Sequence, residues 1–279
     1  MHKRPAIPGH QIVGTVEKCG PGAGRFKIGD RVGIAWLHHA CGACSFCSND
    51  LENLCDKATF SGWDENGGYA ECAVAYERFA YPIPEAFSDA QAAPLLCAGI
   101  IGYRCLRLSG IRPGQRLGLY GFGAAAHIAI QIADHWGCES YVFTRGESHR
   151  KLARKLGAAW VGGAADDPPE RVHASIIFAP AGPLVLDAMR VLERGGTCAL
   201  GGIYMTPIPS MDYTEHLYDE RVIRSVTNAT RRDGEELLKL AAEIPIETKT
   251  QAFNLDQANQ ALTALKTGKI DGAGVLTNA

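Results

Sequence analysis

GLYGFGAAAHIAIQIA (residues 118–133) carries the strongest structural signal in this 279-residue chain. An apolar run ends at Gly121, Phe122 and Gly123, and the residues that follow have the apolar spacing of a helix. Gly121, Gly123 and Ala126 fit G-x-G-x-x-G/A, where glycines allow a tight turn and a small third residue lets helix and strand pack. Because a helix N-terminus offers free N–H groups to a pyrophosphate, we predict that this turn, Phe122 included, binds a dinucleotide. The alternative is a glycine-rich turn without a ligand.

Short apolar runs alternate with helical stretches on both sides of this unit. The predicted strands are residues 116–120, 140–144, 174–179, 197–203 and 222–228, and the predicted helical stretches are 124–137, 149–158 and 184–196. Strands that alternate with helices indicate βαβ units and a parallel sheet. The fold class predicted for residues 94–228 is therefore α/β.

The end of the second predicted strand, SYVFTRGES (140–148), indicates which dinucleotide is preferred. A site for NAD carries Asp or Glu about twenty residues after the glycines, where it binds the ribose hydroxyls. Thr144 and Arg145 stand there instead. A carboxylate would repel a 2′-phosphate, whereas a hydroxyl beside a guanidinium would accept it. We therefore predict cofactor binding by Thr144 and Arg145 and a preference for NADP(H) over NAD(H); the alternative is that Arg145 is a solvated surface residue.

Four of the ten cysteines lie in CGACSFCSNDLENLC (41–55), with the spacing C-x2-C-x2-C-x7-C. They are Cys41, Cys44, Cys47 and Cys55. Four thiolates can enclose one tetrahedral ion and leave no open position, so the pattern predicts a structural zinc. The alternatives are coincidence and an iron–sulfur cluster, but cluster motifs that begin in this way continue x3-C-P.

Outside the α/β segment, glycines and prolines interrupt short strands. Residues 12–36 read as two strands joined by a turn, and GGYAECAVAYERFAYPIP (67–84) reads as a strand pair. Near the C-terminus, residues 234–243 read as a helix, and residues 254–276 as a capped helix that ends at Gly268, followed by a strand.

Composition restricts the partners. The net charge of −2 gives no basic footprint for nucleic acid, and no apolar run is long enough to predict a membrane span. The first residues lack the apolar segment of a secretion signal, so we expect a cytoplasmic protein with a small-molecule substrate.

His10 in PGHQIVG (8–14) and Cys97 in APLLCAG (93–99) are further candidate metal ligands. Singly, each has a more ordinary reading, as a structural histidine and a buried thiol. His10 lies in the β-rich segment, whereas Cys97 leads into the dinucleotide segment, and a substrate would meet a dinucleotide between two domains. Two ligands do not complete a catalytic zinc, which usually has three protein ligands and an open position.

From residue 5 to the end, the chain resembles the zinc-dependent alcohol dehydrogenases of the medium-chain dehydrogenase/reductase superfamily, especially the bacterial branch near cinnamyl alcohol dehydrogenases. The matching motifs are PGHQIVGTVE, GDRVGIAWL, CGACSFC, GGYAE, AAPLLCAGIIGYR, GLYGFGAAAH, IIFAPAG and GAGVL. The resemblance implies a zinc-bearing GroES-like β domain (1–93), a Rossmann domain with a doubly wound parallel sheet (94–228), and a C-terminal segment (229–279) that returns to the first domain.

The resemblance also implies residue roles. His10 and Cys97 become catalytic-zinc ligands, the four cysteines become structural-zinc ligands, and Ile203 lies near the nicotinamide. The substrate would be a small alcohol or aldehyde, and the protein a homo-oligomer.

Two departures from the family matter. Its members have several dozen residues upstream of Pro-Gly-His, with the first cysteine ligand and a Ser or Thr that starts a proton relay, so we expect an N-terminally truncated β domain. The family also usually has Glu where this chain has Gln11. His2, His38 and His39 are candidate replacement ligands, although a solvated loop or a pocket wall is the simpler reading for the last two.

The leading functional prediction is an NADP(H)-dependent alcohol dehydrogenase or aldehyde reductase. The second is a catalytically impaired NADP(H)-binding zinc protein, because ligands are missing. The third is a zinc-independent reductase of the quinone oxidoreductase type, which the retained cysteine lobe disfavours. Trp36, Phe60 and Trp63 are candidates for the wall of a pocket for a bulky aldehyde, or for core positions.

Overall fold

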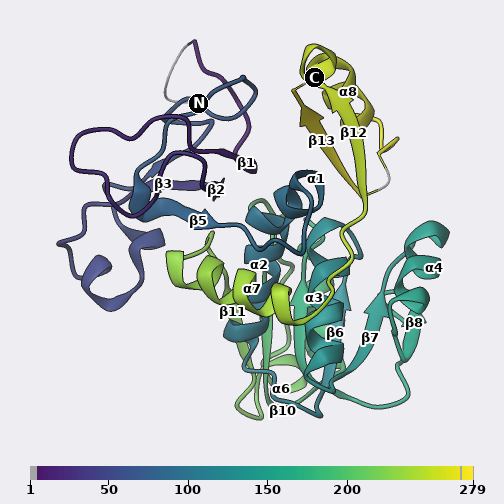
Figure 1. Ribbon diagram of the computed structural model, residues 1–279. Helices are drawn as coiled ribbons and strands as arrows, with labels where there is room; N and C mark the ends of the chain where they lie inside the picture. The colour runs from purple at the N-terminus through teal and green to yellow at the C-terminus, as the bar shows by residue number, and fades with distance from the viewer. Residues whose placement is uncertain (1–4, 271, 279) are drawn as a thin grey trace. The chain divides into compact units, whose positions relative to one another are not determined.

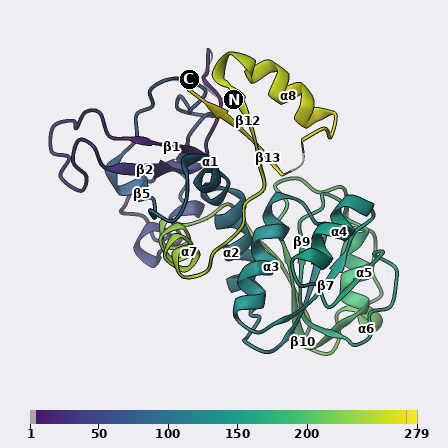
Figure 2. The same cartoon turned by 45° about the vertical axis from the view of Figure 1, so that its right-hand side comes forward.

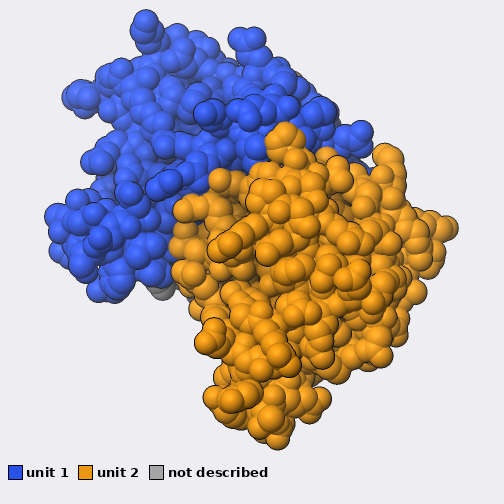
Figure 3. Space-filling model, turned by 90° about the horizontal axis from the view of Figure 1, so that it is seen from below, with its two compact units in different colours: residues 1–100, 228–279 blue, residues 101–227 orange. Residues whose placement is uncertain are grey.

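The computed structural model describes residues 5–270 and 272–278 (Figure 1). The chain forms two compact units, residues 1–100 together with 228–279, and residues 101–227 (Figure 3). It therefore leaves the first unit near residue 100 and re-enters it near residue 228. The division into 1–93, 94–228 and 229–279 stays a prediction.

The second unit is built on a six-stranded sheet in the order β11-β10-β9-β6-β7-β8. The strands are β6 (Arg116–Tyr120), β7 (Glu139–Phe143), β8 (Trp160–Gly162), β9 (Val172–Ile177), β10 (Leu192–Leu200) and β11 (Val222–Ser225). All neighbours pair in parallel, which confirms the predicted parallel sheet. The strand order runs outward in both directions from β6 and β9, so the sheet is doubly wound and its switch point lies between them.

Helices cover both faces of this sheet. They are α2 (Ala98–Ser109), which begins in the first unit, α3 (Ala124–His135), α4 (Glu147–Lys155), α5 (Leu184–Arg190) and α6 (Tyr213–His216). Figure 2 shows α3 and α5 on opposite sides of the strands, as right-handed crossovers in opposite directions require. The core between the layers includes the rings of Tyr120 and Phe143, which stack with centroids 4.2 Å apart.

The prediction of a helical stretch over residues 184–196 was wrong in its second half. Helix α5 ends at Arg190, and β10 begins at Leu192. Gly195 has φ +71° and the pairing of β10 with β9 shifts register between Leu192 and Thr197. The glycine pair Gly195–Gly196 would weaken a helix but is tolerated in an irregular strand, which explains why this segment forms a strand.

The first unit contains three small sheets. The antiparallel sheet is β1 (Ile12–Thr15), β2 (Arg31–Ile34) and β5 (Ala80–Pro82); the others pair β3 (Leu37–His39) with β4 (Thr59–Phe60) and β12 (Thr250–Asn254) with β13 (Ala273–Thr277). Its helices are α1 (Asp89–Ala92), α7 (Arg231–Glu243) and α8 (Ala258–Lys266). Gly268 follows α8 at φ +66°, the left-handed conformation predicted for a residue that ends a helix.

The predicted strand pair over residues 67–84 does not form. Gly67, Gly68 and Tyr69 donate backbone hydrogen bonds to Ile7, Gly9 and Pro8, respectively. In the described part of the chain, only β5 (Ala80–Pro82) is a strand in this stretch. Alternating apolar residues favour a strand only where a neighbouring backbone pairs with them, and the alternation does not reveal that neighbour.

Helix α7 begins three residues before the predicted start. Thr230 caps it: its Oγ1 accepts a hydrogen bond from the Asp233 N–H at 3.2 Å, and the Asp233 carboxylate accepts one from the Thr230 N–H at 2.9 Å. The spacing T-x-x-D is a helix-start signal that the sequence interpretation missed.

We expect Thr230→Ala to lower the free energy of unfolding by about 1–2 kcal/mol, because the cap is lost and the buried Asp233 loses a partner. Urea denaturation followed by circular dichroism measures the change. Thr263→Ala, on the exposed part of α8, is the control; equal losses in both variants would refute the capping role.

Across residues 5–270 and 272–278, the helices are too short or too polar to serve as membrane spans.

Candidate functional site

The structure brings the four predicted cysteine ligands together. Their sulfur atoms all lie within 4.8 Å of one another, and those of Cys41 and Cys47 are 3.9 Å apart. The turn after Cys41 contains Gly42 at φ +73°, and two 3-10 turns, η1 (Cys47–Asn49) and η2 (Glu52–Leu54), carry the chain to Cys55. The local backbone therefore folds the C-x2-C-x2-C-x7-C spacing into one cluster.

The surroundings of the cluster favour thiolates. Hydrogen bonds from the backbone of Ala43 and Cys44 lower the pKa of Cys41 to about 6, and the N–H of Lys57 lies 3.4 Å from Sγ of Cys55. Desolvation raises the pKa of Cys47, so the cluster does not lose all its protons without a cation. Four converging sulfurs with N–H donors around them fit a closed four-coordinate zinc.

His10 and Cys97 also meet, although 87 residues separate them. His10 Nε2 lies 3.1 Å from Cys97 Sγ, and both residues belong to the first unit. Gly9 holds the histidine in place: it has φ +95°, and a Cβ there would lie 2.8 Å from Cε1 of Tyr69. Cys97 is placed by the 3-10 turn η4 (Ala93–Leu96) that ends just before it.

Burial sets the protonation of this pair. It lowers the pKa of His10 below 6.5, so the imidazole is neutral at pH 7 and has a free electron pair for a metal. It raises the pKa of Cys97 to about 11, so the thiol keeps its proton until a cation displaces it. The pair therefore has the chemistry of two metal ligands.

An aromatic group lies against His10. The ring of Trp36 meets the imidazole edge-on at a centroid distance of 4.9 Å. The ring of Phe60 stacks on that of Trp36 with centroids 5.1 Å apart, and the centroid of the Trp63 ring lies 6.5 Å from that of Trp36. The three aromatic residues therefore form one apolar wall that begins at the candidate ligand.

Of the predicted replacement ligands, His38 and His39 do not join the pair. The rings of His38 and His39 pack on Tyr76 at 5.4 and 4.7 Å, and His2 lies outside the described residues. The Gln11 amide is turned to the Pro94 carbonyl, 3.5 Å away. Among the described side chains, the four cysteines are the only group of three or more potential ligands that converges. The described residues therefore offer two candidate ligands for a catalytic zinc, one fewer than its usual set of three.

The predicted dinucleotide turn joins β6 to α3 in the second unit. Gly121 has φ +84°, and a Cβ there would lie 2.9 Å from the Ala179 side chain, so glycine is required. Phe122 and Ala126 are buried. A Cβ on Gly123 would meet nothing within 4 Å, and no side chain caps α3. The backbone is open to a ligand, and the free N–H groups of the first turn fit a pyrophosphate.

Two basic side chains lie near the C-terminal end of β7. Thr144, directly after β7, is buried, and Arg145 is exposed; their binding of a cofactor stays a prediction. Arg150, in α4, donates from Nε to the Thr144 carbonyl at 3.0 Å, which places a second guanidinium here. Sequence reasoning missed Arg150; basic residues in the first turn of the helix after the second strand were the available signal. Ile203 is fully exposed in the loop after β10, and its place near a nicotinamide stays a prediction.

A buried histidine also stands behind the dinucleotide turn. His127 Nδ1 lies 3.4 Å from the Gly123 carbonyl, and burial lowers the pKa of His127, as it does for His10 and His38. The unfolded chain therefore binds more protons than the native state below pH 6.5, and stability falls as pH falls through that range.

We expect the free energy of unfolding to drop between pH 7.5 and 5.5, with each such histidine contributing at most about 1.4 kcal/mol per pH unit. His127→Gln should flatten this dependence, as measured by urea denaturation at both pH values. His135→Gln, exposed at the end of α3, is the control; an unchanged slope in His127→Gln would contradict the assignment.

The chain is similar to known proteins over most of its length. A family model described as "Alcohol dehydrogenase GroES-like domain" matches residues 1–85, and one described as "Zinc-binding dehydrogenase" matches residues 124–243. A probable alcohol dehydrogenase AdhA from Mycobacterium tuberculosis is 50% identical over 281 residues, covering 99% of this chain and 81% of the relative.

Two solved structures share the fold. A cinnamyl alcohol dehydrogenase from Sorghum bicolor has a TM-score of 0.90 and 25% identity, covering 98% of this chain and 82% of the other. A protein named CAD from Helicobacter pylori, complexed with NADP(H), has a TM-score of 0.87 and 25% identity, covering 99% of this chain and 83% of the other.

Proposed function

The chain belongs to the zinc-binding alcohol dehydrogenase family, and from this premise we propose that it transfers hydride between a nicotinamide dinucleotide and an alcohol or aldehyde. The observation that carries the proposal is the 3.1 Å approach of His10 Nε2 to Cys97 Sγ. The family accounts for the fold: a GroES-like domain and a Rossmann domain, as the sequence predicted.

Different residues of the chain would bind the dinucleotide and the metal. The first turn of α3 would bind the pyrophosphate with its N–H groups; Gly121 allows the turn beside Ala179, and Gly123 leaves the backbone open to the ligand. His10 and Cys97 hold a metal, and Trp36 fixes the plane of the imidazole. When bound, the dinucleotide supplies the hydride and zinc supplies a positive charge for the substrate oxygen.

The wall formed by Trp36, Phe60 and Trp63 supports a bulky or aromatic aldehyde as substrate, because stacked rings offer an apolar surface next to the ligand pair. Arg145 and Arg150 support a preference for NADP(H), the dinucleotide bound by the Helicobacter relative. Assembly into a homo-oligomer and a cytoplasmic location stay predictions from the sequence.

The incomplete ligand set favours a second candidate. With two ligands among the described residues and Gln11 turned away, the chain would bind NADP(H) and one zinc without turnover. On the leading proposal, the third ligand of a catalytic zinc lies outside the described residues.

Aldehyde-dependent oxidation of NADPH, followed by its absorbance in zinc-loaded protein, tests the proposal. We expect turnover of an aromatic aldehyde, and a loss of more than about a hundredfold in His10→Gln, because the charge on the substrate oxygen loses its support. Zinc per chain is measured on the same sample, and His135→Gln is the control. Binding of NADPH with one zinc and no turnover would establish the second candidate instead.

A further inference from the structure

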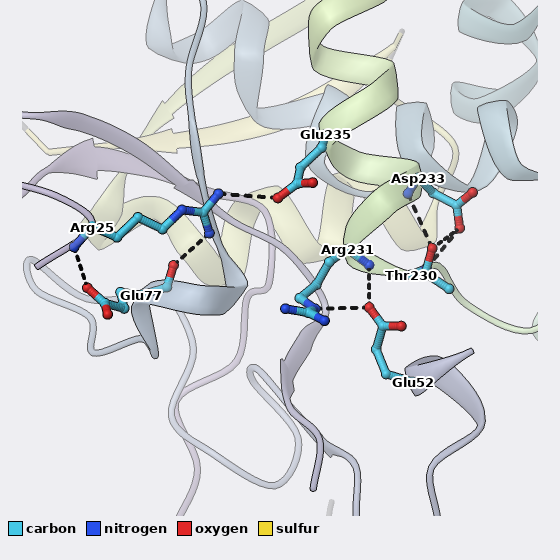
Figure 4. A network of polar contacts seen from close by, with 7 residues as sticks. All are labelled: Arg25, Glu52, Glu77, Thr230, Arg231, Asp233 and Glu235. Carbon is cyan, nitrogen blue, oxygen red and sulfur yellow. Dashed lines mark hydrogen bonds and ion pairs between the residues drawn. The ribbon is translucent and has the colours of Figure 1, made fainter. Parts of the chain in front are cut away.

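An ion pair between a buried carboxylate and a partly exposed arginine joins the loop that carries the four cysteines to helix α7 (Figure 4). Glu52 lies in η2, between Cys47 and Cys55, and is 3% exposed. Its Oε1 accepts hydrogen bonds from the backbone N–H of Arg231 at 2.9 Å and from Nε of Arg231 at 3.0 Å. Its Oε2 is buried and accepts no hydrogen bond among the described residues. A carboxylate buried this deeply is tolerated only while its partners stay in place.

The first of these hydrogen bonds caps the helix. Arg231 is the first residue of α7, so its N–H is one of those that a helix N-terminus leaves without an intrahelical partner. Thr230 satisfies the N–H of Asp233 from within the same segment, whereas the acceptor for Arg231 comes from the cysteine loop. The negative charge of Glu52 also meets the positive end of the helix dipole.

Arg231 touches the cysteine lobe in a second place. Its guanidinium lies over the ring of Phe79, 5.2 Å from the centroid. Phe79 belongs to a small core with Leu37, Ala40 and Cys55, and the other three cysteines pack against it. Helix α7 is therefore held to the lobe by an ion pair and by a cation–π contact.

The lobe itself has little apolar burial to order it. Phe46, Leu51 and Leu54 are each more than a third exposed. A metal ion bound by the four sulfur atoms would therefore be the main interaction that orders the loop from Cys41 to Cys55. It would also fix the position of Glu52.

We propose that zinc in the four-cysteine lobe and the docking of helix α7 stabilise each other, with Glu52 as the link. The metal fixes the loop, the loop presents Glu52, and Glu52 caps α7 close to the point where the chain re-enters the first unit near residue 228. Because linkage is reciprocal, loss of the Glu52 contact weakens zinc binding by the same factor by which loss of zinc weakens the docking. This coupling lies within the first unit and holds whether or not the chain reduces an aldehyde.

A second contact of α7 supplies the control. Glu235 pairs with Arg25 at 3.2 Å, and Arg25 also donates to the backbone carbonyl of Glu77 at 2.9 Å (Figure 4). Glu235 is more than half exposed and touches none of the cysteine loop in this network. Glu235→Gln therefore removes a carboxylate from the same helix without touching the link.

Hydrogen exchange on the full chain, read by mass spectrometry with zinc bound and after chelation, tests the proposal. We expect amide exchange over residues 231–234 to rise about tenfold when zinc is removed, while α4 in the second unit is unchanged. Glu52→Gln, which keeps the size and removes the charge, should show the same rise with zinc bound, and about tenfold weaker zinc binding in competition with a chelator. Glu235→Gln should show neither.

Equal exchange over residues 231–234 with and without zinc would overturn the proposal. So would equal zinc affinities in the Glu52→Gln and Glu235→Gln variants, or a rise that includes α4 equally, since the metal would then support the whole chain and not this link. If Glu52→Gln does not fold, Arg231→Lys is compared in its place; it loses the Nε donor but keeps the cation and the backbone hydrogen bond, so smaller changes in the same direction are expected.

Discussion

Replacing Cys55 by serine should abolish tight zinc binding and lower the free energy of unfolding by about 4 kcal/mol when free zinc is a thousandfold above its Kd. Cys55 is the buried member of the cluster and packs with Leu37, Ala40 and Phe79. A serine hydroxyl is a poor zinc ligand, and its O–H group would be left in an apolar core. The variant should therefore be destabilised twice, by the loss of the metal and by a buried hydroxyl group without a hydrogen-bond partner.

Two measurements check this expectation: zinc per chain by elemental analysis of desalted protein, and urea denaturation with and without chelator. The wild-type chain should lose stability on chelation, whereas Cys55→Ser should show the lower stability in both buffers. Cys19→Ser changes an exposed cysteine outside the cluster and should behave like the wild type. A Cys55→Ser chain that retains one zinc and wild-type stability would show that the lobe is not the tight site.

The cysteine lobe could be predicted because its information is local. Four ligands within fifteen residues can only be brought together by the turns between them, so their spacing suffices. His10 and Cys97 are 87 residues apart, and no spacing rule joins them; the resemblance to a family pointed to them, and the structure places them 3.1 Å apart. Glu52 and Arg231 are 179 residues apart, and neither is one of the residues that define a motif, so nothing in the sequence indicated their ion pair.

The same difference separates the two halves of the fold. The parallel sheet was predicted from strands and helices that each show their own periodicity, and neighbouring βαβ units then fix its order. Residues 67–84 alternate like a strand pair, yet only Ala80–Pro82 pairs, with Val32, Gly33 and Ile34. Alternation describes what a segment can do, whereas pairing depends on a partner that lies elsewhere in the chain.

The candidate dinucleotide site could be read from the sequence only in part, for a related reason. Thr144 and Arg145 follow the second strand directly, so their position at its end can be read from the sequence. Arg150 lies six residues beyond Thr144, on a helix with many exposed basic residues. Its Nε bond to the Thr144 carbonyl, which turns it toward the strand end, depends on the angle at which α4 leaves β7.

Removing Arg145 and Arg150 together should raise the Kd for NADPH about a hundredfold and leave that for NADH within about threefold. Each guanidinium can make charge-assisted hydrogen bonds to a 2′-phosphate, worth roughly 1.5–3 kcal/mol, and a ribose hydroxyl offers no charge to pair with them. Fluorescence titration of each single alanine variant and of the double variant with both dinucleotides measures the effect. The single losses should not add fully if the two groups share one phosphate.

Arg154→Ala provides the matched control, because Arg154 is an exposed arginine one turn further along α4. Arg154→Ala should leave both Kd values unchanged. This result would show that the loss of NADPH binding comes from direct contacts with the phosphate and not from the loss of any positive charge on α4. Arg150→Ala also removes the hydrogen bond to Thr144, so a loss of NADH binding as large as the loss of NADPH binding would mean that Arg150 supports the strand end and not the phosphate. If the double variant still prefers NADPH over NADH, other residues bind the 2′-phosphate. Arg145 would then be a solvated surface residue with no part in the dinucleotide preference.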